Sequence, residues 1–241
     1  MMSFYEMISE HYDVIFPVNP KQVEFVRRYA GKRLLDMAAG TGGLAITLAK
    51  EGYKVTATDL EQEMTAQMSA KKEQGNVPLE IHTLDMRDIN RFKEETFHTI
   101  VCLGNSLVHL ESQEEVLDVL KKTSRLLTEQ GQLIIQIVNY DRILKENIQE
   151  LPIIDRESIQ FFRTYEWREP KIRFHGKLII DNQGEQQIFQ QTTELLPITS
   201  EILQQLLKES GFRKIQLFGS FQGDSYQSDS PAIIAVAVKG Q

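Results

Sequence analysis

Short apolar runs alternate with longer amphipathic stretches from Arg33 onwards. The runs have the length and composition of buried strands, and the stretches repeat apolar residues at helical spacing. The predicted strands are Arg33–Met37, Lys54–Thr58, Leu79–Leu84, Thr96–Leu103 and Gln132–Val138. The predicted helices between them are Gly43–Glu51, Gln62–Gln74 and Gln113–Leu127. This alternation predicts an α/β fold, in which right-handed crossovers join the strands of a parallel sheet.

The two ends of the chain extend this pattern. Helices are predicted at Phe4–His11 and at Pro20–Tyr29, and Asn19 before Pro20 suits an N-cap followed by proline at the first helical position. Near the C-terminus the prediction comprises a helix at Ser200–Ser210 ended by Gly211, and strands at Lys214–Phe218 and Ala232–Val238.

A different pattern occupies residues 159 to 195. β-Branched and aromatic residues follow one another at strand-like spacing, interrupted by Glu169-Pro170 and by the turn residues 181 to 184. We therefore predict a Rossmann-like, seven-stranded, mostly parallel sheet with helices on both faces, formed by residues 1–149 and 196–241. Residues 1–30 would form a helical cap on this core. Residues 150–195 would form inserted antiparallel strands that act as a lid over the substrate.

Composition narrows the class of protein. Of 241 residues, 41% are hydrophobic and 25% are charged, which is typical of a globular chain and excludes a disordered one. The formal net charge of -7 argues against a protein that tracks nucleic-acid phosphates. Cys102 is the single cysteine, so no internal disulfide and no Cys/His metal framework is expected. The first residues show no apolar core of signal-peptide length, and no apolar run approaches about 18 residues. We therefore expect a cytoplasmic protein.

The segment LLDMAAGTGGLAITLA carries the first functional signal. It passes from a strand to a helix through Gly40 and Gly42, which permit a tight turn and close approach of a large ligand. Asp59 ends the next strand, where a carboxylate accepts hydrogen bonds from ribose hydroxyls. Small residues also occur where a helix packs tightly on a strand, but the combination with Asp59 indicates a nucleoside.

Asp36 indicates which nucleoside. It precedes Gly40 by four residues, where a carboxylate would repel a pyrophosphate but attract the ammonium group of an amino-acid ligand. The spacing D-x-x-x-G-x-G followed by Asp59 resembles the first two motifs of class I S-adenosylmethionine-dependent methyltransferases, over at least Arg33–Val138. The resemblance implies S-adenosyl-L-methionine as cofactor and S-adenosyl-L-homocysteine as its product.

The cofactor site implied by the resemblance comprises residues from the N-terminus and from four strand ends: Tyr12, Asp36, Ala38, Gly40, Gly42, Asp59, Leu60, Met64, Asp85, Met86, Leu103, Gly104 and Asn105. Several of these assignments have structural alternatives. Asp85 also suits a plain helix N-cap, and Leu60 and Met64 suit a helix core. The segment around Tyr12 also suits a surface helix that only packs on the sheet.

Two further strand ends carry a more specific resemblance. Residues 102–110 (CLGNSLVHL) and 139–144 (NYDRIL) resemble the corresponding stretches of glycine and glycine/sarcosine N-methyltransferases. The resemblance implies that Asn139 contacts the methyl acceptor, and His109 or Tyr140 would accept a proton if one must be removed. As alternatives, Asn105 would cap the following segment and His109 would be a structural histidine.

Five basic residues of the insert lie among aromatic ones: Arg163, Arg168, Lys171, Arg173 and Lys177. Three interpretations are open: a nucleic-acid surface, a solvated strand face, or an arginine that points inward and binds a substrate carboxylate. An arginine of the inserted region has this last role in the glycine N-methyltransferases. Our hypothesis is Arg173, with Arg168 as the alternative.

Together these features favour a methyltransferase that acts on a small molecule, with an amine bearing a carboxylate as the acceptor that the resemblance suggests. The alternatives are an NAD(P)-dependent oxidoreductase, against which Asp36 argues, and an S-adenosylmethionine-binding module or a methyltransferase acting on RNA. No membrane partner is expected.

Overall fold

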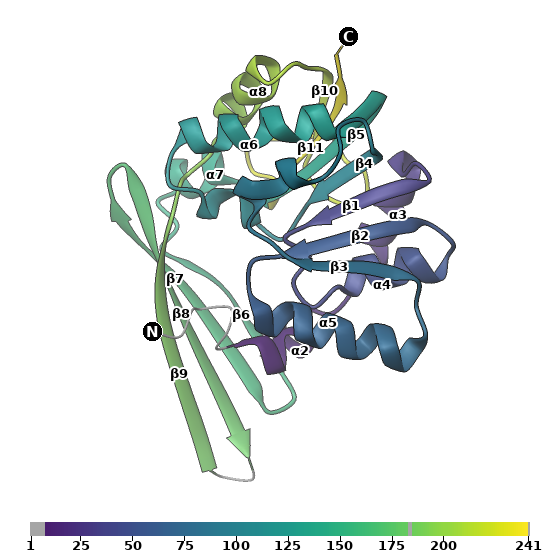
Figure 1. The fold of residues 1–241 in the computed structure, drawn as a ribbon. Helices are drawn as coiled ribbons and strands as arrows, with labels where there is room; N and C mark the ends of the chain where they lie inside the picture. The colour runs from purple at the N-terminus through teal and green to yellow at the C-terminus, as the bar shows by residue number, and fades with distance from the viewer. Residues whose placement is uncertain (1–7, 183–184, 241) are drawn as a thin grey trace.

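The computed structural model describes residues 8–182 and 185–240, which form two sheets (Figure 1). The larger sheet has the strand order β10-β11-β5-β4-β1-β2-β3. Its strands are β1 (Arg33–Met37), β2 (Lys54–Asp59), β3 (Leu79–Thr83), β4 (Phe97–Cys102), β5 (Leu127–Val138), β10 (Phe212–Phe218) and β11 (Ala232–Lys239). The first five pair in parallel, whereas β11 runs antiparallel to both β5 and β10. The predicted seven-stranded, mostly parallel sheet is confirmed.

Helices cover both faces of this sheet. The α-helices of the described chain are α2 (Tyr12–Ile15), α3 (Pro20–Tyr29), α4 (Gly43–Lys50), α5 (Gln62–Gly75), α6 (Gln113–Leu126), α7 (Tyr140–Lys145) and α8 (Ser200–Glu209), and the 3-10 helices are η1 (Ser9–His11), η2 (Met86–Arg91) and η3 (Ser106–His109). One hydrophobic cluster joins α3, α4 and α5 to the sheet, and another joins α6, α7 and α8 to its opposite face (Figure 1). Such two-sided burial explains why the central strands read as continuous apolar runs.

Two helices begin or end where their capping residues predicted. The side chain of Asn19 caps α3 by accepting a hydrogen bond of 3.0 Å from the amide of Lys21, with Pro20 at the first helical position. Gly211 follows α8 with φ +87°, a conformation that favours glycine. Local chemistry therefore sets these boundaries.

Three differences from the predicted boundaries are larger than two residues. Helical structure near the N-terminus continues through η1 and α2 to Ile15 instead of ending at His11, and the first residues of the predicted helix at Phe4–His11 lie outside the described part of the chain. β5 begins at Leu127, five residues early, because a register irregularity places polar residues within the strand. A strand at Glu150–Arg156 precedes residue 159, and Pro152 obscured its pattern.

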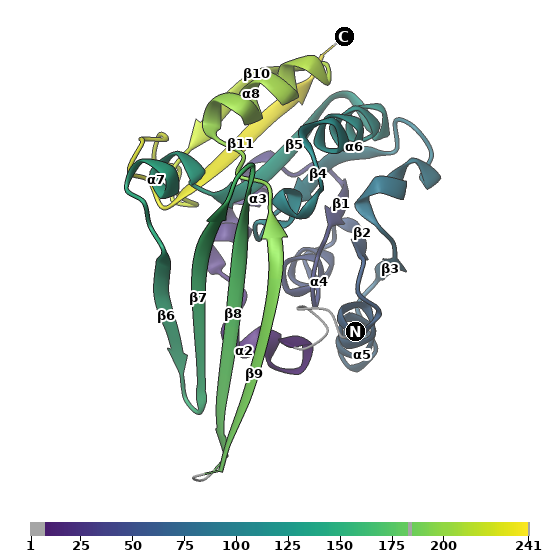
Figure 2. The same ribbon diagram turned by 90° about the vertical axis from the view of Figure 1, so that its left-hand side faces the viewer.

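The second sheet, called the small sheet below, is antiparallel. Its order is β6-β7-β8-β9, and its strands are β6 (Glu150–Arg156), β7 (Ile159–Arg168), β8 (Lys171–Asn182) and β9 (Glu185–Leu195). The chain enters it from α7 and returns through α8 to the larger sheet (Figure 2). α2 packs between the small sheet and the core, where Ile8 and Ile15 join a cluster with Phe161 and Leu178.

Across the described ranges, no helix combines the length and the apolar character that crossing a bilayer requires.

Candidate active site

The carboxyl ends of the parallel strands gather the polar residues of the site. Asp36 is the penultimate residue of β1, and Asp59 is the last residue of β2. Leu103 and Gly104 directly follow β4. In an open α/β sheet, ligands bind outside these strand ends. The small sheet lies against the same end, so the two sheets enclose the space between them (Figure 1).

The loop after β1 is fixed to the end of β2. The amide of Gly40 donates a hydrogen bond of 2.7 Å to Oδ2 of Asp59, and the amide of Glu61 donates one of 3.0 Å to Oδ1. Gly40 has φ +57°, and a Cβ at this position would lie 3.1 Å from the ring of Tyr12. A glycine is therefore required where the loop passes beneath this ring.

Asp36 is a buried carboxyl group. Its side chain is 3% exposed, and burial, together with the charge of Asp59, raises its pKa to about 7. Burial also raises the pKa of Asp59, although the amides of Glu61 and Gly40 oppose this shift. No described Lys, Arg or His forms an ion pair with Asp36. A cationic ligand would therefore relieve an unfavourable burial.

Two adjoining cavities lie at the strand ends. The smaller one has a volume of about 440 Å³ and is lined by nine of the predicted cofactor residues: Tyr12, Ala38, Gly40, Asp59, Leu60, Met64, Asp85, Met86 and Gly104. The larger one has a volume of about 640 Å³ and is lined on the core side by Asp36, Ala38, Leu103, Gly104 and Asn105. Residues Tyr12, Ala38, Gly104 and His109 line both cavities, which therefore meet at these four residues.

His109 is a neutral group at this junction. Burial lowers its pKa to about 4, so the imidazole carries no charge at neutral pH. A neutral imidazole at this position can accept a hydrogen bond from a ligand, but it is a weak base.

The segment around Tyr12 closes the same junction. Burial and the charges of Asp59 and Asp36 raise the pKa of the Tyr12 hydroxyl, which therefore stays protonated. The neighbouring Asp13 accepts hydrogen bonds from the hydroxyl of Thr41 and from Nζ of Lys71. α2 is thus attached both to the glycine loop and to α5.

Four of the predicted cofactor residues, Asp85, Met64, Leu60 and Gly42, differ in their structural surroundings. Asp85 caps η2 through the amide of Arg87 and accepts hydrogen bonds from its guanidinium, at 3.0 Å and 2.6 Å to Oδ2. Met64 is 1% exposed and Leu60 is 58% exposed, yet both line the smaller cavity. Gly42 lines neither cavity, and a Cβ there would lie 2.3 Å from Cγ of Met68 in α5. Its role in the described structure is the close approach of this helix.

Asn139 and Tyr140 do not line either cavity. The side chain of Asn139 donates to the carbonyl oxygens of Ser228 and Ser230 and accepts from the hydroxyl of Tyr226. Tyr140 is fully buried in the hydrophobic core, where its hydroxyl accepts a hydrogen bond from Asn105. The catalytic roles suggested by the sequence stay predictions for both residues, because neither lines one of these two cavities.

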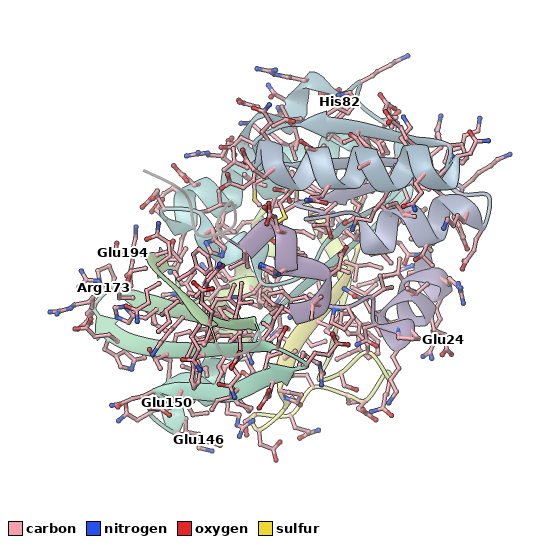
Figure 3. All side chains as sticks on the ribbon, turned by 90° about the horizontal axis from the view of Figure 1, so that it is seen from below. Glu24, His82, Glu146, Glu150, Arg173 and Glu194 are labelled. Carbon is pink, nitrogen blue, oxygen red and sulfur yellow. The ribbon has the colours of Figure 1, made fainter. Side chains whose placement is uncertain are left out.

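Arg173 lies on the face of the small sheet that points away from the core. Its guanidinium is within 4 Å of the carboxylates of Glu166 and Glu194, and the labelled side chains lie at the periphery of the molecule in Figure 3. Arg168, the alternative, also pairs with Glu166. Neither arginine lines a cavity.

Arg163 is the arginine that the fold places in the larger cavity. It lies on β7 between Phe161 and Tyr165, and all three side chains face the core because strand residues two apart share a face. Its Nη2 donates a hydrogen bond of 2.8 Å to the carbonyl oxygen of Pro152, while its buried Nε has no partner. Arg163 occupies the position midway between the aromatic residues Phe161 and Tyr165, at the two-residue spacing of one strand face. This spacing is the sequence signal that could have identified it.

The chain is similar to known methyltransferases in sequence and in fold. Residues 34–131 match a family model described as a methyltransferase domain. The chain is 27% identical over 224 residues to a glycine/sarcosine N-methyltransferase of Aphanothece halophytica, covering 90% of this chain and 80% of that protein. It is 35% identical over 135 residues to glycine N-methyltransferase of Homo sapiens, covering 49% of this chain and 45% of that protein. A crystal structure of an S-adenosylmethionine-dependent methyltransferase from Clostridium acetobutylicum superimposes with a TM-score of 0.84 at 17% identity, covering 98% of this chain and 99% of that one.

The fold and the sequence matches together support a class I S-adenosylmethionine-dependent methyltransferase. They likewise support S-adenosyl-L-methionine as its cofactor.

Proposed function

We propose that this methyltransferase acts on a small amine that carries a carboxylate. The observation that carries the proposal is the guanidinium of Arg163, which lines the larger cavity and forms no ion pair with a carboxylate of the described residues. A charge held in a partly desolvated place requires a partner. An acceptor carboxylate would supply one, with the geometry that a guanidinium favours.

The charges of the two sheets are complementary to the two ligands. Asp36 on the core side suits the ammonium group of S-adenosylmethionine, and Asp59 suits its ribose hydroxyls. Leu60 and Met64 offer apolar surface to an adenine ring, and Asp85 lies within reach of the same cavity. Arg163, on the side of the small sheet, is then left for the second ligand, and the small sheet would act as the lid that holds it.

When bound, S-adenosylmethionine supplies a methyl group activated by the neighbouring sulfonium. The chain's own residues contribute alignment and the exclusion of water, which are the main requirements of an in-line displacement. His109 and Gly104 line both cavities and therefore flank the place where cofactor and acceptor would meet. The neutral imidazole of His109 would accept a hydrogen bond from the amine and orient its lone pair.

The relatives support the same acceptor class. The curated proteins to which the chain is similar include glycine/sarcosine N-methyltransferases, whose acceptors by name are amines that carry a carboxylate. A panel of amino acids and matched decarboxylated amines isolates the effect of the carboxylate, whichever amine is the natural acceptor.

The test compares Arg163→Ala with Arg173→Ala. Both substitutions remove an arginine from the small sheet, but only Arg163 lines the cavity, so Arg173→Ala is the matched control. Loss of a charged partner costs about 2 to 5 kcal/mol, which corresponds to a loss of at least roughly 30-fold in kcat/KM for a carboxylate-bearing amine. Activity would be measured by transfer of label from S-adenosylmethionine.

Binding of S-adenosylhomocysteine, measured by calorimetry, provides the second readout. We expect its Kd to be unchanged in Arg163→Ala. If the loss appeared in this Kd instead, Arg163 would hold the cofactor's own carboxylate, and the proposal would fail. Equal activity of Arg163→Ala and the wild type towards amino acids would also refute it.

A further inference from the structure

Gln136 is a polar residue on an apolar face of the larger sheet. On this face Ile134, two residues earlier in β5, is fully buried, and so is Ile234, the partner of Gln136 on β11. The Gln136 side chain is half-buried and lines the larger cavity. A polar group that folding removes from water is costly unless it forms hydrogen bonds, so the partners of the Gln136 amide indicate its role.

The loop after β4 fixes the orientation of this amide. The backbone amide of Gly104 donates a hydrogen bond of 2.9 Å to Oε1 of Gln136. A backbone N–H is a donor only, so the side-chain atom that it meets must be the oxygen. The carbonyl oxygen of Gln136 also accepts a hydrogen bond of 3.1 Å from the amide of Asn105. Both bonds hold Gln136 beside Gly104, one of the four residues at which the two cavities meet.

The amide nitrogen of Gln136 is the group that remains for a ligand. Within the described ranges, 8–182 and 185–240, Nε2 of Gln136 has no hydrogen-bond partner. Nε2 carries two N–H donors, so its ligand must present an acceptor atom, and an ammonium group is excluded. In S-adenosylmethionine and in an amino-acid acceptor, the strongest acceptor atoms are the carboxylate oxygens.

The position of Asp36 indicates which of these carboxylates Gln136 faces. Asp36 pairs with Val101 of β4, and Val101 pairs with Ile134 of β5. Asp36 and Gln136 therefore lie on the same face of the sheet, two strand spacings or about 10 Å apart across it. The ammonium and carboxylate groups of an α-amino acid are attached to the same carbon atom. Because Asp36 suits the ammonium group of S-adenosylmethionine, the carboxylate of the same molecule stays near β1, and Gln136 is left for the acceptor.

We propose that Nε2 of Gln136 donates a hydrogen bond to the carboxylate of the methyl acceptor, so that Gln136 binds this carboxylate from the core and Arg163 binds it from the small sheet. Both side chains line the larger cavity. The inference rests on the proposed function, because it requires an acceptor that carries a carboxylate. The two oxygens of a carboxylate accept several hydrogen bonds, so the amide adds to the guanidinium and does not replace it.

Gln136→Glu removes the donor and keeps the bond to the loop. The glutamate side chain has nearly the same shape and still accepts a hydrogen bond from Gly104, but oxygen replaces the two N–H groups. The readout is the ratio of kcat/KM for an amino acid to that for its decarboxylated counterpart: glycine against methylamine, sarcosine against dimethylamine, and phenylalanine against phenethylamine. We expect this ratio to fall at least about tenfold, which is the loss of a hydrogen bond to a charged group.

Gln132→Glu is the matched control. Gln132 is half-buried on the same face of β5, and it lines neither cavity. The control introduces the same charge on the same strand, four residues or about 13 Å before Gln136. We expect its ratio to equal that of the wild type.

Gln136→Met separates hydrogen bonding from charge repulsion. Methionine keeps the length of the side chain but has neither the amide oxygen nor the N–H donors. We expect the ratio to fall about tenfold in this variant as well. A displacement of the Gly104 loop alone would lower kcat/KM for amino acid and amine alike and leave the ratio unchanged. A fall in Gln136→Glu without a fall in Gln136→Met would be repulsion only and would refute the inference.

Binding of S-adenosylhomocysteine, measured by calorimetry, identifies the source of the carboxylate. We expect its Kd to be unchanged in Gln136→Met. A Kd at least about tenfold weaker would assign Gln136 to the carboxylate of the cofactor and overturn the inference. An unchanged ratio in both Gln136 variants, together with the expected loss in Arg163→Ala, would refute the role of Gln136 and leave the proposed function intact. A ratio that Arg163→Ala also leaves unchanged would refute both proposals.

Discussion

The carboxyl groups of Asp36 and Asp59 lie on two adjacent parallel strands, and the charge of Asp59 adds to the effect of burial in raising the pKa of Asp36. When two acidic groups lie close together at the carboxyl ends of adjacent strands, their repulsion makes the doubly ionised state unfavourable. A bound cation would stabilise this doubly ionised state. Protonation, folding and ligand binding are therefore linked at this pair of residues.

The affinity for S-adenosylmethionine should rise with pH. Asp36, with a pKa of about 7, is mostly protonated at pH 6 and must lose this proton to pair with the ligand's ammonium group. The ionised fraction rises about fivefold between pH 6 and pH 7, and the association constant should follow it. Calorimetry in two buffers of different ionisation enthalpy would measure the release of the proton. Asp36→Asn should abolish both effects, and an affinity independent of pH would contradict the assignment.

Asp36→Asn should stabilise the ligand-free protein. A carboxyl group whose pKa is raised on folding binds more protons in the folded state, so its contribution to stability is lost as pH rises from about 4 to about 7. Removing the charge should raise the free energy of unfolding at pH 8 by up to about 4 kcal/mol, and by much less at pH 5. Urea denaturation at both pH values would measure it. A variant that is less stable than the wild type at pH 8 would show that the carboxylate is satisfied in the free protein.

Asp13→Ala should loosen the N-terminal segment. Asp13 accepts hydrogen bonds from Thr41, a residue 2% exposed, and from Lys71 at 2.6 Å, so its loss leaves a buried hydroxyl without its acceptor. Such a loss costs about 1 to 3 kcal/mol. We expect S-adenosylhomocysteine to dissociate roughly tenfold faster, as measured by stopped-flow fluorescence. Glu10→Ala, an exposed acidic residue nearby, is the control, and equal rates for both variants would show that α2 does not retain the cofactor.

Asn139→Ala should destabilise the fold while leaving the chemistry intact. The side chain of Asn139 joins the end of β5 to the carbonyl oxygens of Ser228 and Ser230, at 3.1 Å and 2.9 Å. Their loss should lower the free energy of unfolding by about 2 to 3 kcal/mol. The KM for the acceptor and kcat should be unchanged at a temperature where the variant is fully folded. A large fall in kcat under those conditions would restore a catalytic role for Asn139.

The parallel core was predictable because its signals are local. The buried strands read as apolar runs, and the Gly40 loop, Asp36 and Asp59 identify themselves by spacing along a short segment. Similarly, Asn19 caps α3 through contacts within three residues. In these cases both interacting residues lie in the same element or in two neighbouring elements, so a short stretch of sequence is enough to recognise the interaction.

The small sheet was less predictable because its faces depend on what packs against them. Arginines occur on both faces of β7, and β8 adds Arg173. Only docking against the core makes the face of Arg163 the inner one and leaves Arg173 among carboxylates. Asn139 is a comparable case, since its partners lie about 90 residues away in a loop without a recognisable motif. Contacts of this range are set by the tertiary fold.

The small sheet is one uninterrupted stretch of chain, from Glu150 to Leu195, and both of its connections return to the same end of the core. The side of the larger cavity that the small sheet forms can therefore be exchanged as one segment, while the predicted cofactor residues, from Tyr12 to Asn105, stay on the rest of the chain. A chimera that receives this stretch from a related enzyme should inherit the donor's acceptor preference together with the recipient's affinity for S-adenosylmethionine. In evolution, the same separation lets one half of a bisubstrate site diversify while the other is held constant.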